Sequence, residues 1–358
     1  MEKEERVEKK EEKAKSEGAE KAEEVKEALF YKKLKNDTVR CELCPIFCVI
    51  KNNERGNCKV RKNINGKLIS LVYGKPCSIA TDPIEKKPFY HFLPKEKALS
   101  IATLGCNFHC LNCQNAEISQ EVPEKIPGDY FPPEKIVEIA EKEKVRIISY
   151  TYTEPTIFYE YMIDIAKLAK AKGIKNVIVS NGYINPKPLK QLCKYIDGAN
   201  IDLKGISDKF YREICSGTLA PVLETLKILK ENKIWTEVTN LIIPGRNDSK
   251  KDTLKLVRWV KKNLGKDVPL HFSAFFPCYK LLTTPPTSFE TLKKARQIAI
   301  KEGMHYVYTG NISDEEGSTT FCPKCKKPVI KREGYYVIIN NLKQEKCYNC
   351  KKKISGIF

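Results

Sequence analysis

The chain of 358 residues is 41% hydrophobic and 30% charged, which is enough to bury one large core and one or two smaller modules. Its sequence lacks an apolar run near the roughly 20 residues of a membrane span, and its charged N-terminus differs from a secretory signal, so we expect a cytoplasmic protein with no membrane contact. Fifteen cysteines in such a protein favour metal or iron–sulfur binding over a disulfide framework. The formal net charge of +19 favours an acidic partner such as nucleic acid, although abundant Lys among many Glu is also typical of proteins from hot environments.

The N-terminal part of the chain divides into a tail and a cysteine-rich segment. Residues 1–38 start as a run of Glu, Lys and Ala with almost no apolar stripe, which predicts a charged flexible tail. Residues 39–95 are expected to form a metal-binding module whose ligands are Cys41, Cys44, Cys48 and Cys58. Four cysteines hold either zinc or a second iron–sulfur cluster, and the spacing does not separate the two. Cys77 is expected to be a free thiol.

Short apolar runs alternate with amphipathic segments between residues 96 and 312. The expected strands are Leu99–Leu104, Val145–Thr151, Asn176–Ser180, Ala199–Leu203, Ile234–Ile243 and Leu270–Phe276. The expected helices are Pro133–Lys144, Ile157–Lys172, Pro186–Tyr195, Ala220–Asn232, Ser249–Asn263 and Ser288–Glu302. Strands separated by helices of this length indicate repeated βα units and a parallel sheet. Six such units predict an α/β fold with a partial (βα)6 barrel rather than a closed barrel of eight units.

Three thiols with the spacing Cys-x3-Cys-x2-Cys follow the first of these strands, at Cys106, Cys110 and Cys113. Thiolates normally hold each iron of a [4Fe-4S] cluster, so three of them leave one iron open. An open iron can bind the amino and carboxylate groups of S-adenosylmethionine, and an electron passed through the cluster can cleave the sulfonium to a deoxyadenosyl radical. The alternative is a stripe of three core cysteines on a helix. The polar and aromatic residues between them, and Gly105 before them, favour a ligand loop.

Polar residues follow or end the other strands, where ligands gather in this architecture. They are Glu154, Ser180, Asn181, Asp202, Lys204 and Asn240. Together they predict a catalytic mouth, but each also has a structural interpretation. Glu154 is placed to cap the next helix, and Ser180–Gly182 has the composition of a turn. Asp202 and Lys204 share one face of a strand and form a plain ion pair in the alternative reading. Asn240 and His271 are equally compatible with the core.

Two cysteine knuckles near the C-terminus predict a separate small module over residues 313–358. The expected ligands are Cys322, Cys325, Cys347 and Cys350, which enclose the strand-like run Tyr335–Asn340. This spacing is typical of a zinc ribbon. The module is rich in Lys, so it either contacts RNA or DNA or forms a cap that docks on the barrel.

With these residues identified, the chain resembles the radical S-adenosylmethionine (radical SAM) superfamily, in the branch related to pyruvate formate-lyase activating enzyme. More narrowly it resembles the radical SAM enzyme of the AmmeMemoRadiSam system, from about Cys41 to the C-terminus. The motifs that carry the resemblance are Cys41-x2-Cys44-Pro45, Asp82-Pro83-Ile84-Glu85-Lys86-Lys87-Pro88, Gly105-Cys106-Asn107-Phe108-x-Cys110, Cys113-Gln114-Asn115, Tyr152-Thr153-Glu154-Pro155 and Tyr308-Thr309-Gly310-Asn311.

The resemblance implies a [4Fe-4S] cluster on Cys106, Cys110 and Cys113 and reductive cleavage of S-adenosylmethionine. Tyr152–Pro155 occupies the place of the family's Gly-Gly-Glu-Pro segment, which implies that Glu154 helps to seat the methionine amino group without the two-glycine backbone contact. Ser180–Gly182 and Asp202–Lys204 match the family's Thr-Asn-Gly and Asp-Leu-Lys segments, which implies sugar and carboxylate contacts to the cofactor. Such chemistry requires an electron donor such as ferredoxin or flavodoxin. The system's name implies AMMECR-type and Memo-like partners.

Two functions remain in competition at this point. The first is an enzyme that abstracts hydrogen from a glycine in a partner protein, another peptide side chain, an RNA or a small metabolite. The second is a basic metal-binding module that binds RNA or DNA and uses the barrel only as a scaffold. The metal-binding modules at both ends of the chain are a departure from the short activating enzymes. The sequence therefore does not decide whether the substrate is a glycine in a partner protein.

Overall fold

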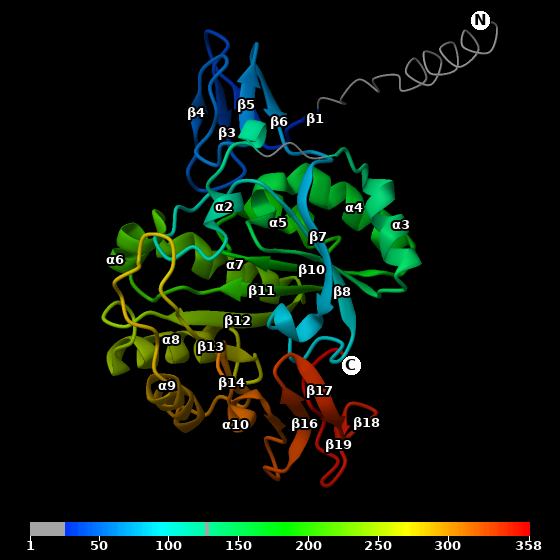
Figure 1. The fold of residues 1–358 in the computed structure, drawn as a ribbon, viewed down its shortest axis with the longest axis vertical. Coiled ribbons are helices and arrows are strands. Elements are labelled where there is room, and N and C mark those ends of the chain that lie inside the picture. The colour runs from blue at the N-terminus through cyan, green and yellow to red at the C-terminus, as the bar shows by residue number, and fades with distance from the viewer. Residues whose placement is uncertain (1–25, 126–128) are drawn as a thin grey trace, which may run out of the picture.

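The computed structural model describes residues 26–125 and 129–358, and at its centre lies one curved sheet of eight strands (Figure 1). Its strand order is β14-β13-β12-β11-β10-β9-β8-β7. The strands are β7 (Pro76–Pro83), β8 (Lys97–Thr103), β9 (Ile147–Tyr150), β10 (Lys175–Ser180), β11 (Gly198–Asp202), β12 (Trp235–Ile242), β13 (Leu270–Ala274) and β14 (Val307–Gly310). Strands β8 to β14 are parallel, and β7 is antiparallel to β8. The two outer strands, β7 and β14, do not pair with each other, so the barrel is open.

Helices connect the parallel strands. They are α3 (Pro133–Lys142), α4 (Tyr159–Ala171), α5 (Pro186–Leu192), α7 (Leu219–Glu231), α8 (Lys250–Asn263) and α9 (Phe289–Lys301). Helix α8 illustrates why these segments are helical. The Ser249 side chain accepts a hydrogen bond from the backbone N–H of Asp252 and caps the first turn. The helix then buries Thr253, Leu256, Val257 and Val260, whose spacing places them on the single face that packs on the sheet.

The predicted partial (βα)6 barrel is confirmed, and each of the six expected strands and six expected helices has its counterpart. Two strands of the central sheet were not expected. Strand β7 adds an antiparallel edge, and β14 adds a further parallel strand after α9. Shorter elements complete this part of the chain: α2 (Ala116–Ser119), α6 (Asp208–Phe210) and α10 (Glu315–Ser318), with single turns at η1 (Ile84–Lys86), η2 (Pro123–Lys125), η3 (Pro155–Phe158) and η4 (Tyr211–Cys215).

The N-terminal module consists of two small antiparallel sheets at one end of the barrel (Figure 1). They contain β1 (Lys26–Glu27), β2 (Tyr31–Lys33), β3 (Val39–Cys41), β4 (Val49–Ile50), β5 (Arg61–Ile64) and β6 (Lys67–Ser70). The prediction of a flexible tail to residue 38 is wrong for residues 26–38, because β1 pairs with β6 and β2 with β3. The rest of that tail lies outside the described residues. The module's expected end at residue 95 is also too late, because β7 already belongs to the central sheet.

The N-terminal module shares one core with the barrel. Val39, Leu43 and Ile50 are buried in the same apolar cluster as residues of the central sheet and of α4. The Arg61 guanidinium and the Glu160 carboxylate of α4 form an ion pair that is almost completely buried. Because removing one partner of a buried pair leaves an uncompensated charge, substituting Arg61 or Glu160 alone should destabilise the protein strongly.

The C-terminal module packs beside β14. It consists of β15 (Thr320–Phe321), β16 (Pro328–Glu333), β17 (Tyr336–Asn340), β18 (Leu342–Lys343) and β19 (Lys346–Cys347). Its Val329, Ile330 and Ile354 are buried together with Tyr306 and Tyr308 of the barrel. The module therefore docks on the barrel as a cap, which was one of the two expected arrangements.

Buried hydrogen bonds fix this docking. The ring of His91 contacts the Ser355 carbonyl through Nδ1 (2.6 Å) and the Tyr308 hydroxyl through Nε2 (2.5 Å). Arg332 Nη2 donates to the Tyr90 carbonyl at 2.7 Å.

Within the described residues, no helix combines the length and the apolar character that crossing a membrane requires.

Candidate active site

The three central cysteines lie on an irregular loop between β8 and α2, so the alternative of a helical stripe is wrong. The loop leaves the strand through Gly105, whose φ is +93°. A Cβ at this position would lie 2.7 Å from the Cys58 carbonyl oxygen, so both the backbone conformation and the close contact require glycine. This turn directs the chain across the end of the sheet.

Cys106, Cys110 and Cys113 line one cavity of about 300 Å³ at the carboxyl ends of the parallel strands. The other walls come from almost every strand of the barrel. They include Tyr152 and Thr153 after β9, Ser180 and Asn181 at β10, Asp202 and Lys204 at β11, Thr239 on β12, Ser273 on β13 and Asn311 after β14. The volume lies at the lower end of the range typical of small-molecule sites. The structure thus brings four of the six predicted polar residues, Ser180, Asn181, Asp202 and Lys204, to one place with the cysteine loop.

Backbone and side-chain hydrogen bonds hold the loop in position. Asn107 donates to the Tyr183 carbonyl (2.8 Å) and accepts from Asn181 Nδ2 (2.8 Å). The backbone N–H groups of His109 and Leu111 donate to carbonyls of η4. Asn115 Nδ2 donates to the Tyr152 carbonyl at 2.7 Å. The three thiols are therefore positioned by the fold itself.

Two groups in the cavity bear on what it can bind. Asn112 lies between the second and third cysteines, and its Oδ1 is buried without a hydrogen-bond partner among the described residues. A group bound in the cavity can satisfy this oxygen. Burial raises the pKa of the Cys106 thiol well above its usual value, and the nearby Glu154 charge raises it further. Metal binding must therefore displace a proton from this thiol, and positive iron in contact with the sulfur makes that favourable.

Asp202 and Lys204 form an ion pair across the cavity wall, with Nζ 2.8 Å from Oδ2. Burial lowers the pKa of Lys204, but the charges of Asp202 and Cys110 outweigh it, and the net shift of this pKa is upward. The lysine is therefore a permanent positive charge beside the second cysteine. The predicted ion pair is present, and it also faces the cavity.

Glu154 does not line the cavity, because its carboxylate is completely buried and fully used by the protein. Oε1 accepts hydrogen bonds from Thr156 N (2.9 Å), Thr156 Oγ1 (2.7 Å) and Ser180 Oγ (2.8 Å). Oε2 accepts from Asn181 N at 2.8 Å. Burial raises the pKa of this carboxyl, and these donors offset part of the shift. The predicted helix cap is confirmed, and a contact of Glu154 with a cofactor stays a prediction.

Asn240 and His271 also lie away from the cavity. Thr239 and Leu241 line it, so Asn240 between them points to the opposite face of β12 and donates to the Leu203 carbonyl at 2.8 Å. His271 Nε2 contacts the buried Glu237 carboxylate at 2.7 Å. Both residues follow the core alternative stated from the sequence.

The sequence analysis did not predict a cluster of side chains around Lys87. Lys87 lines the same cavity. Lys87 Nζ lies 2.8 Å from both Asp82 Oδ2 and the Tyr152 hydroxyl, and 4.0 Å from the Tyr152 ring centre. Burial lowers the pKa of Lys87, and Asp82 offsets part of this shift. The segment containing Asp82 and Lys87 carried part of the family resemblance, and that was the only signal in the sequence.

Two further cysteines that were not predicted as site residues support the loop. The Cys215 thiol of η4 hydrogen-bonds the Cys110 sulfur and lowers the pKa of Cys110. Cys278 Sγ donates to the Asn112 carbonyl at 3.3 Å. Both residues lie outside the walls of the cavity described above.

The four N-terminal cysteines, Cys41, Cys44, Cys48 and Cys58, line a single enclosed cavity. This cavity adjoins the cysteine loop, because Asn57 Nδ2 donates to the Asn107 carbonyl (3.1 Å) and Asn57 Oδ1 contacts His109 Nε2 (3.1 Å). The choice between zinc and an iron–sulfur cluster stays a prediction. Cys77 lies in β7 and is not part of these walls.

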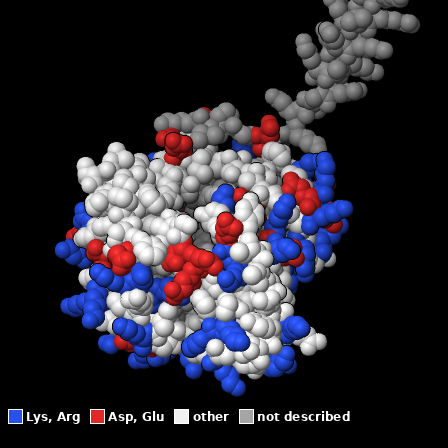
Figure 2. Space-filling view, turned by 60° about the horizontal axis from the view of Figure 1, so that its bottom comes forward, with Lys and Arg blue, Asp and Glu red and all other residues white. Residues whose placement is uncertain are grey.

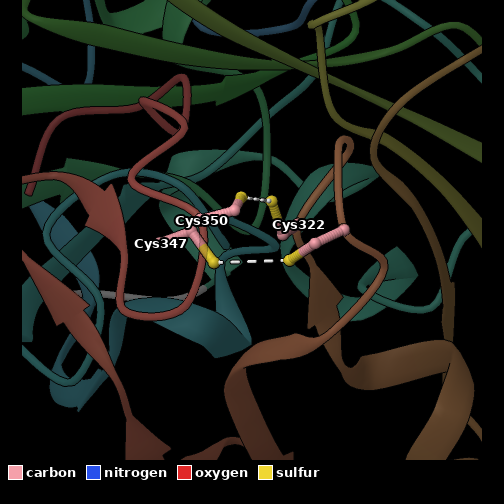
Figure 3. A group of neighbouring side chains, drawn as sticks. Cys322, Cys347 and Cys350 are labelled. Carbon is pink, nitrogen blue, oxygen red and sulfur yellow. Dashed lines mark hydrogen bonds between the residues drawn. The ribbon is translucent and has the colours of Figure 1, made fainter.

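The C-terminal cysteines form a compact tetrad (Figure 3). Cys322, Cys325, Cys347 and Cys350 are the one group in the described chain whose sulfur atoms all lie within 4.8 Å of one another. Cys322 and Cys350 are 3.5 Å apart, and Cys325 and Cys347 are 3.7 Å apart, sulfur to sulfur. A zinc ion binds thiolates at about 2.3 Å in tetrahedral geometry, which places sulfur pairs just under about 4 Å apart. The tetrad therefore matches a single tetrahedral ion.

Several known proteins are similar to this chain. The sequence matches the radical SAM superfamily over residues 100–259. It is 50% identical to the uncharacterized protein MJ0808 of Methanocaldococcus jannaschii over 332 residues, 92% of this chain and 99% of that protein. A pyruvate formate-lyase-activating enzyme of Staphylococcus epidermidis is 24% identical over 228 residues, 59% of this chain and 88% of the enzyme. The crystal structure of a radical SAM methyltransferase from Sphaerobacter thermophilus aligns with 61% of this chain and 67% of its own, with a TM-score of 0.47 and 12% identity. The chain belongs to the radical SAM superfamily.

Proposed function

We propose that this enzyme holds a [4Fe-4S] cluster on Cys106, Cys110 and Cys113 and abstracts a hydrogen atom from a substrate at the barrel mouth. Membership of the superfamily implies the cluster and S-adenosylmethionine. Cys106, Cys110 and Cys113 would hold the cluster, which would supply one electron for the reductive cleavage of S-adenosylmethionine to methionine and a deoxyadenosyl radical. The observation that carries the proposal is that the three thiols and the polar ends of the strands line one cavity.

The cavity walls supply the groups that such a cofactor needs. Asp202 would accept hydrogen bonds from the ribose hydroxyls, and Lys204 would pair with the methionine carboxylate. Asn181 joins the two halves of the site, because it bonds to Asn107 of the cysteine loop and follows β10. Glu154 acts behind them by fixing Ser180 and the backbone of Asn181.

For the substrate, we favour a glycine in a partner protein, as in activating enzymes. The support is the similarity to an activating enzyme over most of that enzyme's length. An electron donor such as ferredoxin or flavodoxin supplies the electron. We place the chain in the AmmeMemoRadiSam group on the motifs given above, with AMMECR-type and Memo-like proteins as partners. We assign zinc to the C-terminal tetrad on its sulfur–sulfur distances.

The test is anaerobic reconstitution with iron and sulfide, followed by reduction in the presence of S-adenosylmethionine. Wild-type protein should release deoxyadenosine and methionine in equal amounts. Cys110→Ala should lose deoxyadenosine formation and most of its iron while keeping zinc. The matched control is Cys193→Ala, which removes a half-buried thiol near the end of α5 and should behave as wild type. Equal deoxyadenosine from Cys110→Ala and wild type would refute the proposal.

A further inference from the structure

A second, larger cavity of about 960 Å³ lies between the barrel mouth and the C-terminal module. On the barrel side its walls include Phe276 after β13 and the loop after β14. On the other side they come from the β16–β17 hairpin, including Tyr335 and Ile338. The C-terminal module therefore forms one wall of a groove as well as a cap.

This groove is continuous with the candidate active site. Gln114, which directly follows the third cysteine of the loop, lines both cavities, and so does Asn311 after β14. A molecule held in the groove can therefore extend one group to the place where the cofactor would react. This is the position that a substrate requires in the proposed function.

The hairpin wall has an unusual surface for a small module. Strand β17 is the outer strand of its three-stranded sheet, and within the described chain its outer edge pairs with no other strand. Three large apolar residues are exposed on it: Tyr336 (69%), Ile338 (54%) and Ile339 (39%). Proteins normally protect such an edge, because it offers unpaired backbone groups and apolar side chains to any extended chain. Peptide-binding domains use the same combination to add a strand.

The charge of the groove distinguishes between the classes of macromolecule. The acidic residues in its walls are Asp314, Glu315 and Glu333, and the one basic residue is Arg332. Arg332 is buried and faces the Glu85 carboxylate at 3.7 Å, whereas Glu315 pairs with Lys331 at 3.0 Å. The negative charges of Asp314 and Glu333 have no ion-pair partner in the described part of the chain.

The surrounding surface is basic, so this acidic groove stands out on a chain of net charge +19. Figure 2 shows acidic side chains beside a hollow, with Lys and Arg over the lower and right parts of the surface. A nucleic-acid backbone would be repelled here, because its phosphates carry the same sign of charge. A chain that carries Lys or Arg would be attracted.

We propose that the groove binds an extended, basic polypeptide segment of a partner protein, which adds to the β17 edge and presents one residue to the active site. This rests on the proposed function, which it deepens by naming the substrate class. The apolar side chains of the segment pack on Ile338 and Phe276, and its basic side chains face Asp314 and Glu333. The partner segment is thus recognised largely through its own backbone hydrogen bonds and through its pattern of apolar and basic side chains.

The probe is a fluorescein-labelled peptide of about 12 residues that alternates Lys and Val around a central Gly and spans about 40 Å when extended. Its anisotropy is measured with reconstituted full-length protein and S-adenosylmethionine. The comparison probes are the same peptide with Glu in place of Lys, and a single-stranded RNA of similar length. Ile338→Asp and Glu333→Lys alter the groove, and both positions are exposed, so folding should be preserved. Val49→Asp is the control, with a side chain 62% exposed on β4 of the N-terminal module.

The basic peptide should bind, and Ile338→Asp should weaken it by about tenfold, the effect of losing one central apolar contact. Glu333→Lys should weaken the basic peptide and strengthen the acidic one, whereas Val49→Asp should change neither. Preferential binding of the RNA, or equal binding by wild type and Ile338→Asp, would overturn the proposal. Deoxyadenosine formation without peptide is measured for wild type and Val49→Asp on the same preparations and should be the same in both. Its absence in wild type would refute the proposed function, while the anisotropy would still report on the groove.

Discussion

Replacing Glu154 by Gln distinguishes between two roles of this residue, as a structural cap of the turn η3 and as a contact of the cofactor. The substitution keeps the shape of the side chain but turns one carboxylate oxygen into an amide donor. If that amide stands where Oε2 is, it faces the backbone N–H of Asn181 and leaves a buried donor unpaired. One such group costs about 1 to 3 kcal/mol, and the three bonds to the other oxygen lose their charge assistance, so we expect a loss of about 2 to 4 kcal/mol in the free energy of unfolding.

Urea denaturation of metal-loaded protein, followed by circular dichroism under anaerobic conditions, measures this free energy. The control is Glu138→Gln on the exposed surface of α3, where the loss of a pair with Lys135 should cost at most about 0.5 kcal/mol. Iron content should fall with Glu154→Gln, because Asn181 holds the cysteine loop through Asn107. Unchanged stability combined with a tenfold or greater loss of S-adenosylmethionine affinity would show that Glu154 contacts the cofactor, and would refute its assignment as a structural cap.

Three further predictions concern the other parts of the chain. Gly105→Ala should destabilise the protein by at least about 1 to 3 kcal/mol and lower its iron content, because φ is +93° and a Cβ would meet the Cys58 carbonyl; iron equal to wild type would contradict this. Cys322→Ser should lower bound zinc by one ion per chain, measured by mass spectrometry of the metal, and leave deoxyadenosine formation in place; unchanged zinc would contradict it. Burial lowers the pKa of His91 to about 4, against about 6.5 in the unfolded chain, so its contribution to stability is complete above pH 6.5 and falls by about 3 kcal/mol as the pH decreases to 4. In urea denaturation measured between pH 6.5 and 4, the free energy of unfolding should fall less for His91→Gln than for wild type. An identical dependence of this free energy on pH would refute the assignment of the effect to His91.

The elements that the sequence predicted correctly are those with strong apolar patterns. Strand β8 is buried at every position except its first, and such strands read as continuous apolar runs. Strand β7 was missed because all eight of its residues are only partly buried, and it contains Asp, Ser and Thr between two prolines. Its place in the sheet comes from pairing with β8, which no local pattern records.

The residues of the candidate site also fall into those that the sequence predicted and those that it did not. The cysteine loop and the Asp202–Lys204 pair were predicted because each is contained in a short segment. Lys87 was not, because its partner Tyr152 is 65 residues away in the sequence. Asn240 shows a different limit, since neighbouring residues of a strand face opposite sides and an error of one position moves a side chain from the cavity to the core.

The contact between the two cysteine-rich loops has a consequence for how they respond to substitution. A Cβ at Gly105 would lie 2.7 Å from the Cys58 carbonyl oxygen, and Asn57 bonds to both Asn107 and His109. A displacement of either loop is therefore transmitted to the other. The two sets of thiols form one mechanical unit, so a residue that orders one loop also helps to order the other.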